Sequence, residues 1–501
     1  MKRLEALWYL RNSALSPPVG LGVPMDDASR VASESWGRSR EAKGTAIGII
    51  GIGVFVINLD LTLAISIFPA LLDDLGENVG TASWVVNAQT VGIAAGLVTG
   101  GQLGDRLGRR DVFAGGLLGY SLLALACGWV SNLPALIAIR LAMGFAGAVV
   151  FPTSMGLIAE RFPPEERPRA LAIWSGLAGL AGLVGPFFGA AVVRWLSWEW
   201  AFIVLGPLCI VGAVLARFRL SPSETSAAAL SFWGSTLHIA TVASLFGVCA
   251  LGQDVGWTSV ATLSAGVVAV GCVALFLAME AQSASPQFPR DLRQPSFVRA
   301  LVGVCALGFG LGAGMFSMPL FATELLGVPD ASAGFVLVPA ALTLLIAAFA
   351  SGRIVGRYGA ARIAGVSLTL SATTLLALSS LDAGSALSTL YLLSGMSGIG
   401  IGLGLPSFAG LALESIVAGS SGVGSGWYNT FRQLGTAVGV ASFALVLAGV
   451  AVEEPMSSES TAAAFRLAYG SSCGITVLGL LSFGFIRRRG ESLAGEARRF
   501  A

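Results

Sequence analysis

The sequence contains few charged residues, and this scarcity limits the kind of protein that it encodes. Asp, Glu, Lys and Arg make up 12% of the 501 residues, whereas soluble domains carry about 25%. Hydrophobic residues account for 55% of the chain, and the mean hydropathy is +0.79. Because so little charge cannot cover a water-facing surface, the composition predicts an integral membrane protein.

The side chains that usually hold metals and cofactors are also scarce. The chain has one histidine, His238, and its six cysteines lie inside apolar runs without metal-ligand spacing. We therefore expect free, packed thiols, no metal, no resident cofactor and no catalytic residues. No Gly-x-x-x-x-Gly-Lys-Ser/Thr run occurs, which excludes ATP as the energy source. Nothing in the composition indicates a nucleic-acid partner.

Long apolar runs are abundant. Each is about 20 residues long, which is enough to cross ~30 Å of hydrocarbon as a helix. The runs lie near residues 46–71, 82–103, 112–131, 134–158, 169–193, 199–217, 231–252, 258–280, 298–322, 333–351, 363–381, 386–411, 427–450 and 465–486. They predict an all-α membrane protein with about fourteen transmembrane helices.

The apolar runs divide the chain into parts. We expect a polar cytoplasmic tail at 1–44, a six-helix bundle at 45–220 and two additional helices at 230–282. A second six-helix bundle is expected at 295–487, followed by a basic cytoplasmic tail at 488–501. The first basic residues are not followed closely by an apolar core, so we expect no signal peptide. Met25 is an alternative start.

Loop charges predict the orientation. Alternate loops carry the basic residues Arg106, Arg109, Arg110, Arg161, Arg167, Arg169, Arg217, Arg219, Arg290, Arg293, Arg299, Arg353, Arg357, Arg362 and Arg487 to Arg489. The opposite loops carry Asp73, Asp74, Glu77, Asp254, Glu324, Asp330, Asp382, Glu453 and Glu454. The positive-inside rule then places both termini in the cytoplasm of a multi-pass inner (plasma) membrane protein.

An internal repeat connects the two bundles. Three residues of one loop recur at a constant offset in a second loop: Gly101, Arg106 and Gly108 align with Gly352, Arg357 and Gly359. Asp105 of the first loop is replaced by Gly356. Such repeats are common in transporters, whose substrate site lies between the repeats.

The first copy of this loop carries a recognisable motif. It reads Gly101-Gln-Leu-Gly-Asp105-Arg106-Leu-Gly108-Arg109-Arg110. The run closely resembles the loop between helices two and three of major facilitator superfamily transporters, Gly-x-x-x-Asp-Arg-x-Gly-Arg-Arg. Asp105 beside a helix N-terminus and a guanidinium would gain from dipole and charge together. We expect this loop to act as a latch on the cytoplasmic side; a plain topogenic loop is the alternative.

Further segments are similar to the fourteen-helix drug:proton antiporter branch of that superfamily. They are Leu59-Asp60-Leu-Thr62 with Pro69, Arg140-Leu-Ala-Met-Gly144, the run from Gly176 through Gly182 to Gly185-Pro186-Phe-Phe-Gly189, and Gly426-Trp-Tyr-Asn429-Thr-Phe-Arg432-Gln433-Leu-Gly435. The resemblance implies a leak-proof pivot at Pro186, and tight packing without gating is the alternative. Glu199, Asn87 and Gln89 depart from the usual pattern of the branch.

Asp60 is the leading functional candidate. It lies about fifteen residues into an apolar helix, where a carboxylate is costly unless it is paired or neutral. Arg140 of the fourth helix lies at a comparable depth and is its natural partner. We hypothesise that protonation of Asp60 loosens this pair and couples proton entry to reorientation. The alternative is a permanent structural ion pair.

Other candidates carry weaker signals. Arg432 and Gln433 are expected in the first turns of helix thirteen, where pairing with Glu414 would have a structural role. Asn429 belongs to the same motif, and His238 is expected to face lipid or packed side chains. The candidates for substrate contact, all aromatic, polar or soft side chains in or beside apolar runs, are Trp84, Asn87, Gln89, Met315 and Phe316.

Together these features predict an exporter that exchanges protons for amphipathic small molecules by alternating access. The expected partners are a small-molecule substrate, protons and the lipid bilayer, with the proton gradient as energy source and a monomer as the functional form. Two alternatives remain. One is a dedicated exporter of an endogenous metabolite or self-made antibiotic. The other is a transporter-like receptor that moves nothing.

Overall fold

The structure is a computed structural model that describes residues 25–75, 79–130, 132–225, 232–283, 286–289, 292–416, 420–450 and 458–500. The chain divides into two units, Met1–Thr45 and Ala46–Ala501, and the site lies in the second. Residues 1–24 of the expected tail, together with the expected loop charges Glu77, Arg290, Glu453 and Glu454, lie outside the described residues.

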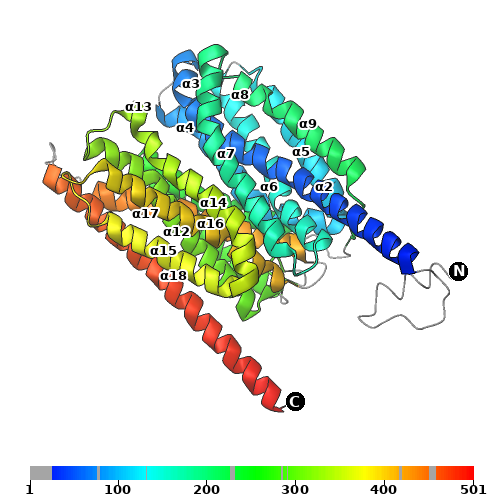
Figure 1. Ribbon diagram of the computed structural model, residues 1–501. Helices are drawn as coiled ribbons and strands as arrows, with labels where there is room; N and C mark the ends of the chain where they lie inside the picture. The colour runs from blue at the N-terminus through cyan, green and yellow to red at the C-terminus, as the bar shows by residue number, and fades with distance from the viewer. Residues whose placement is uncertain are drawn as a thin grey trace. The chain divides into compact units, whose positions relative to one another are not determined.

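The first half of the chain forms one group of helices (Figure 1). They are α2 (Met25–Ser66), α3 (Phe68–Leu75), α4 (Val79–Leu107), α5 (Arg109–Cys127), α6 (Leu133–Arg161), α7 (Arg167–Trp195), α8 (Trp200–Ile203) and α9 (Leu205–Arg219). Local sequence explains where they begin. The Asn132 side chain, for example, accepts a hydrogen bond from the Ala135 backbone N–H over 2.9 Å and so caps the start of α6.

The second half forms a corresponding group. Its helices are α12 (Pro295–Glu324), α13 (Asp330–Ala333), the short 3₁₀ turn η2 (Gly334–Leu337), α14 (Val338–Tyr358), α15 (Ala360–Leu378), α16 (Leu387–Glu414), α17 (Ser421–Val450) and α18 (Ser458–Phe500). The halves meet where α17 packs against α4 and α6, and where α14 and α16 pack against α7.

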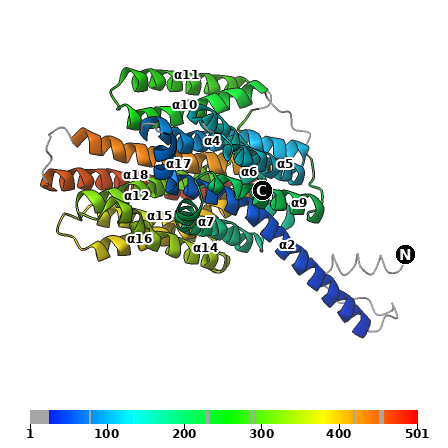
Figure 2. The ribbon, with the colours of Figure 1, turned by 90° about the horizontal axis from the view of Figure 1, so that it is seen from above.

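Two helices, α10 (Phe232–Asp254) and α11 (Val260–Gln282), lie between the halves in sequence. They pack on each other, and α10 also packs on both α4 and α17. Figure 2 shows the pair along one edge, with α10 on the inner side. The inserted pair therefore contacts both halves.

Thirteen helices of the described residues are long and apolar enough to cross a membrane. They do not include α4, which is 29 residues long but carries several polar side chains along its length. With α4, the count matches the predicted number of about fourteen. The expected first span is interrupted at Ile67, between α2 and α3, and residues 25–44 of the expected tail continue α2 as helix.

The internal repeat is visible in the backbone. α5 and α15 each contain 19 residues, and the glycine before each has positive φ, +97° at Gly108 and +84° at Gly359. An L side chain rarely adopts this conformation, which explains why glycine recurs at the same place in both copies.

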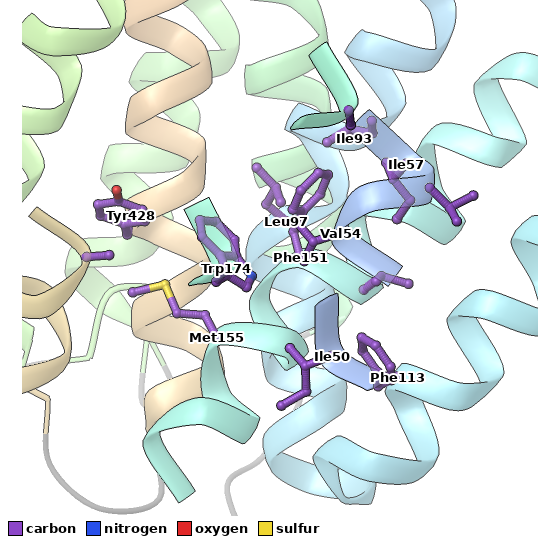
Figure 3. Close-up of a cluster of buried hydrophobic side chains, with 14 of the residues drawn as sticks. Ile50, Val54, Ile57, Ile93, Leu97, Phe113, Phe151, Met155, Trp174 and Tyr428 are labelled. Atoms are coloured by element: carbon purple, nitrogen blue, oxygen red, sulfur yellow. The ribbon is translucent and has the colours of Figure 1, made fainter. Parts of the chain in front are cut away.

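The largest hydrophobic cluster combines residues from both halves. Figure 3 shows part of it: Leu97, Phe151 and Trp174 lie between the α2 side chain Val54 and Tyr428 of α17. A second cluster, which includes Phe321, Phe443 and Phe465, belongs to the second half alone. Continuous packing across the halves thus occurs in the region that also contains the loop motif.

The positive φ of Gly359 leads to a stability prediction. An ideal Cβ at Gly359 would meet no atom within 4 Å, so Gly359→Ala would add backbone strain alone, about 1–3 kcal/mol. We expect a lower midpoint in thermal unfolding of the purified protein. Gly365→Ala inside α15, where a Cβ also has open space, is the matched control and should be neutral or stabilising. Equal midpoints for the two variants would contradict the strain argument.

Candidate functional site

A fully buried ion pair joins α2 to α6. Arg140 Nη1 lies 2.8 Å from both carboxylate oxygens of Asp60, and both side chains have 0% exposure. The contact expected from the sequence is therefore present. Because a charge in this environment is costly without a partner, each residue fixes the position of the other.

Two further side chains complete the Asp60 site. Gln89 Nε2 donates to Asp60 Oδ2 and to the Tyr120 hydroxyl, both over 2.7 Å. Tyr120 in turn donates a short hydrogen bond to Asp60 Oδ2. Gln89 is completely buried here and belongs to the Asp60 site in this arrangement, and its contact with substrate stays a prediction. Tyr120 was missed, since a tyrosine within an apolar run gives no sign of its partner.

Arg140 is also held from other directions. Its Nε donates to the Val85 carbonyl of α4 over 2.9 Å, and its guanidinium carbon lies 5.1 Å from the centre of the Phe202 ring. The site therefore draws on α2, α4, α5, α6 and α8, all in the first half. Donors from α4, α5 and α6 thus meet at the single carboxylate of Asp60.

Asp105 connects the two halves. Its Oδ1 accepts from the Gly422 backbone N–H over 2.9 Å, and its Oδ2 accepts from the Val423 N–H over 3.0 Å. These N–H groups belong to the first turn of α17, where the helix dipole favours an anion. Arg109 donates to the same carboxylate over 2.8 and 2.9 Å. The carboxylate thus joins α4 to α17.

The helices approach closely around this contact, at what we call the Asp105 end. A Cβ on Gly101 would lie 2.1 Å from the Gly422 carbonyl oxygen, and one on Gly426 would lie 2.7 Å from the Leu97 oxygen. The related contact between α7 and α14 is also tight, because a Cβ on Gly352 would lie 3.0 Å from the Cα of Arg169. The Asp105 end is therefore closed.

The arginines of the motif have separate partners. Arg109 also contacts Glu160 over 3.3 Å, whereas Arg110 donates to the Leu220 carbonyl over 3.3 Å and to Asp111 over 2.7 Å. Arg106 is exposed. Of the residues expected in the gate, Gly101, Asp105 and Arg109 therefore lie at the contact between α4 and α17, whereas Arg110 binds Leu220, just after the end of α9.

The glycines of α7 face two different helices. Gly176 and Gly179 face Phe349 and Leu344 of α14, whereas Gly185 and Gly189 face Thr62 and Ser66 of α2. A Cβ on Gly182 would meet nothing within 4 Å. Nine residues turn a helix by about half a turn beyond whole turns, so Gly185 points away from Gly176. α7 continues through Pro186.

The candidates in the second half lie elsewhere than expected. α17 begins at Ser421, so Arg432 lies about 17 Å along the helix rather than in its first turns. Within the described residues, the charged neighbours of Glu414 are Arg167 and Arg299, and the predicted pairing with Arg432 was wrong. Asn429 is buried and donates to the Ser425 carbonyl over 3.0 Å.

The remaining candidates form no shared cluster. Gln433, Trp84 and Asn87 are half-buried. Met315 has 50% exposure and Phe316 has 36%, and Phe316 packs edge-on against Phe443 with 6.3 Å between ring centres. His238 is buried beside Trp427, with 5.0 Å between the ring centres, and thus faces packed side chains.

Asp105 lies past the apolar stretch of α4, and its surroundings shift the pKa of its carboxyl group. Burial raises the pKa of this carboxyl above its ordinary value, while Arg109 and the N–H groups of Val423 and Gly422 oppose the rise. A carboxyl exposed to water lacks this burial. Protonation is therefore easier in the closed arrangement than in one where Asp105 reaches water.

Asp60→Asn tests whether the buried ion pair is charged in this arrangement. Loss of one partner leaves Arg140 buried without its counter-ion, at a cost of about 3–5 kcal/mol. We expect a clearly lower thermal midpoint, with partial recovery when Arg140→Gln is added. A variant as stable as wild type would show that Asp60 is already neutral in the closed arrangement.

Asp105 leads to a prediction about pH. Because its pKa is raised in the closed arrangement, lowering the pH should favour closure of the Asp105 end. This stabilisation of the closed arrangement is complete below the ordinary pKa of a carboxyl group. It is lost as the pH rises through the raised pKa of Asp105. Distances between spin labels across the Asp105 end would report it. Asp105→Asn should remove the pH dependence, and an unchanged dependence in that variant would assign it to another group.

Known proteins with this sequence pattern and fold are membrane transporters. The model of the Major Facilitator Superfamily matches residues 50–228 and 218–440. The tetracenomycin C resistance and export protein of Streptomyces glaucescens is 26% identical over 84% of this chain and 79% of its own length. The multidrug resistance protein Stp of Mycobacterium tuberculosis is 29% identical over 79% of this chain and 74% of its own.

A solved structure has the same fold. The human organic anion transporter MFSD10 (TETRAN) superimposes with a TM-score of 0.66 at 16% identity, covering 88% of this chain and 99% of that one. The family model thus matches more than half of the chain. The fold of the solved transporter agrees with this match. The chain is a multi-pass membrane transporter, not an enzyme, and belongs to the Major Facilitator Superfamily, in its branch of drug and antibiotic resistance exporters.

Proposed function

We propose that this protein is a proton-coupled antiporter that exports amphipathic small molecules by alternating access. The observation that carries the proposal is the Asp60 carboxylate, which is fully buried in α2 and held by Arg140, Gln89 and Tyr120. No other described acidic side chain is buried together with an arginine so far from a helix end. The proton gradient would supply the energy.

The closed Asp105 end corresponds to the outward-facing state in this proposal. The arginines of the adjoining loops favour the cytoplasm for this end. Both termini would then lie in the cytoplasm, and the protein would be a monomer in the inner (plasma) membrane. Asp105 and Arg109 would stabilise this state through the first turn of α17.

The coupling step follows from the Asp60 site. A proton entering from outside would neutralise Asp60 and remove most of its attraction for Arg140. Because Arg140 also holds the Val85 carbonyl of α4, its release would loosen α4, the helix that carries Asp105. The Asp105 end could then separate from α17, admit substrate from the cytoplasm and return the proton there.

The names of the relatives support the export of drug-like molecules. One is named for resistance to a single antibiotic and its export, and another for multidrug resistance. The first name also supports a narrower candidate function, the dedicated export of one self-made compound or endogenous metabolite. A panel of substrates separates the two, since a dedicated exporter would move one chemical class alone.

Efflux from energised cells tests the proposed function. Cells loaded with a fluorescent cation such as ethidium should lose it faster with the wild-type protein than with an empty vector. An uncoupler should abolish the difference, and Asp60→Asn should reduce it at least tenfold, because the variant cannot exchange the proton. Leu122→Ala, at a 60% exposed position on α5, serves as a control variant within the same bundle. Efflux by Asp60→Asn at the wild-type rate and pH dependence would exclude Asp60 from coupling.

A further inference from the structure

We infer that the inserted pair α10–α11 acts as a strap that holds the Asp105 end closed, with Trp427 and Ser235 as its positioning residues. The inference rests on the proposed alternating-access motion and assigns a role to the two helices that the six-plus-six arrangement does not require. Its evidence is a set of contacts that join the pair to α17 on one side and to α4 on the other.

Trp427 is the attachment on α17. It follows Gly422 and Val423 by about one turn and is 8% exposed. Aromatic rings from the inserted part surround it: His238 of α10 at 5.0 Å, Phe288 at 5.2 Å and Phe276 of α11 at 6.4 Å between ring centres. The pairs with His238 and Phe288 are edge-to-face, an arrangement that favours one orientation of the ring. The inserted part therefore packs around Trp427 of α17, the helix whose N-terminus binds Asp105.

Hydrogen bonds continue this attachment to α4. Trp427 Nε1 donates to the Gln287 carbonyl over 2.8 Å, and Gln287 Nε2 donates to Ser235 Oγ over 3.2 Å. Ser235 in turn donates to Gln102 Oε1 over 3.3 Å. Gln102 is the neighbour of Gly101, at the closest approach of α4 to α17. The chain of bonds thus crosses from one half to the other beside the gate.

The short segment 286–289 is itself fixed by α11. Glu280 accepts from the backbone N–H groups of Gln287 and Phe288 over 2.9 and 2.6 Å. A carboxylate that binds two successive N–H groups holds the segment in one conformation. Gln287 therefore presents its carbonyl to Trp427 and its side chain to Ser235 at the same time.

The segment that enters α10 is anchored on the first half. Arg110 and Arg161 donate to the carbonyls of Leu220 and Ser221 over 3.3 and 2.5 Å, and the Arg110 N–H donates to Ser223 Oγ over 3.1 Å. Arg110 belongs to the loop motif but does not bind Asp105. Its contacts fix residues 220–223, which precede α10 in the chain, beside that motif.

The apolar face of α10 completes the strap. Val242 and Phe246 pack against Ala94 and Ala95 of α4, and Leu434 and Ala437 of α17 lie against the same cluster. α10 thus lies over the seam between the two helices (Figure 2). If α4 and α17 separate at the Asp105 end, the strap must release one of them. The intact strap therefore favours the closed state.

Distance measurements between the halves test this inference. Spin labels on Leu107→Cys and Tyr358→Cys, which are 57% and 50% exposed, would report opening of the Asp105 end in a variant without its native cysteines. Trp427→Phe keeps the ring but loses the donor to Gln287. We expect it to raise the ratio of long to short distances about fivefold, the effect of one lost neutral hydrogen bond. Ser235→Ala should act in the same direction.

Trp198→Phe is the matched control. Trp198 is also buried, and its Nε1 donates to Asp74 over 3.0 Å, within the first half and away from the strap. The inference is supported if Trp427→Phe and Ser235→Ala raise the open population and Trp198→Phe does not. Distance distributions of the first two variants that match wild type or the control would overturn it. Because distances are read without substrate, absence of ethidium export would count against the proposed function and not against the strap.

Discussion

The pairing of Asp60 with Arg140 is the constraint on which the rest of the structure depends. Neither charge is stable alone inside the bundle, so α2 and α6 are held at one separation while both are ionised. Gln89 and Tyr120 extend this constraint to α4 and α5. Protonation of Asp60 would therefore change contacts that join α2, α4, α5 and α6. One of these helices, α4, carries Asp105.

The gate depends on a different kind of contact. Asp105 binds backbone N–H groups at the start of α17, which requires α4 and α17 to approach without side chains at Gly101 and Gly422. The repeat preserves the turn at Gly359 but replaces the carboxylate with Gly356. The contact between α7 and α14 therefore relies on close packing alone, and the two sides of the Asp105 end are unequal in strength.

Much of this architecture could be predicted from the sequence, because span length, loop charge and turn glycines are local properties. The Asp60–Arg140 contact was also predictable, since an intramembrane carboxylate requires a partner. What the sequence did not reveal depends on helix rotation and tertiary contact. The contacts of Gln89 with Asp60 and Tyr120 follow only from the placement of its helix beside them. α17 starts at Ser421, before the apolar run predicted at 427–450, and this earlier start decides the depth of Arg432.

In the proposed mechanism, uptake of substrate is coupled to release of the proton from Asp60. The most direct test of this coupling is proton release from purified protein in weakly buffered solution when an exported substrate is added. The proposed mechanism predicts release of up to about one proton per molecule by wild type and none by Asp60→Asn. Equal release by both proteins, or none from wild type with a substrate that it exports, would contradict the mechanism.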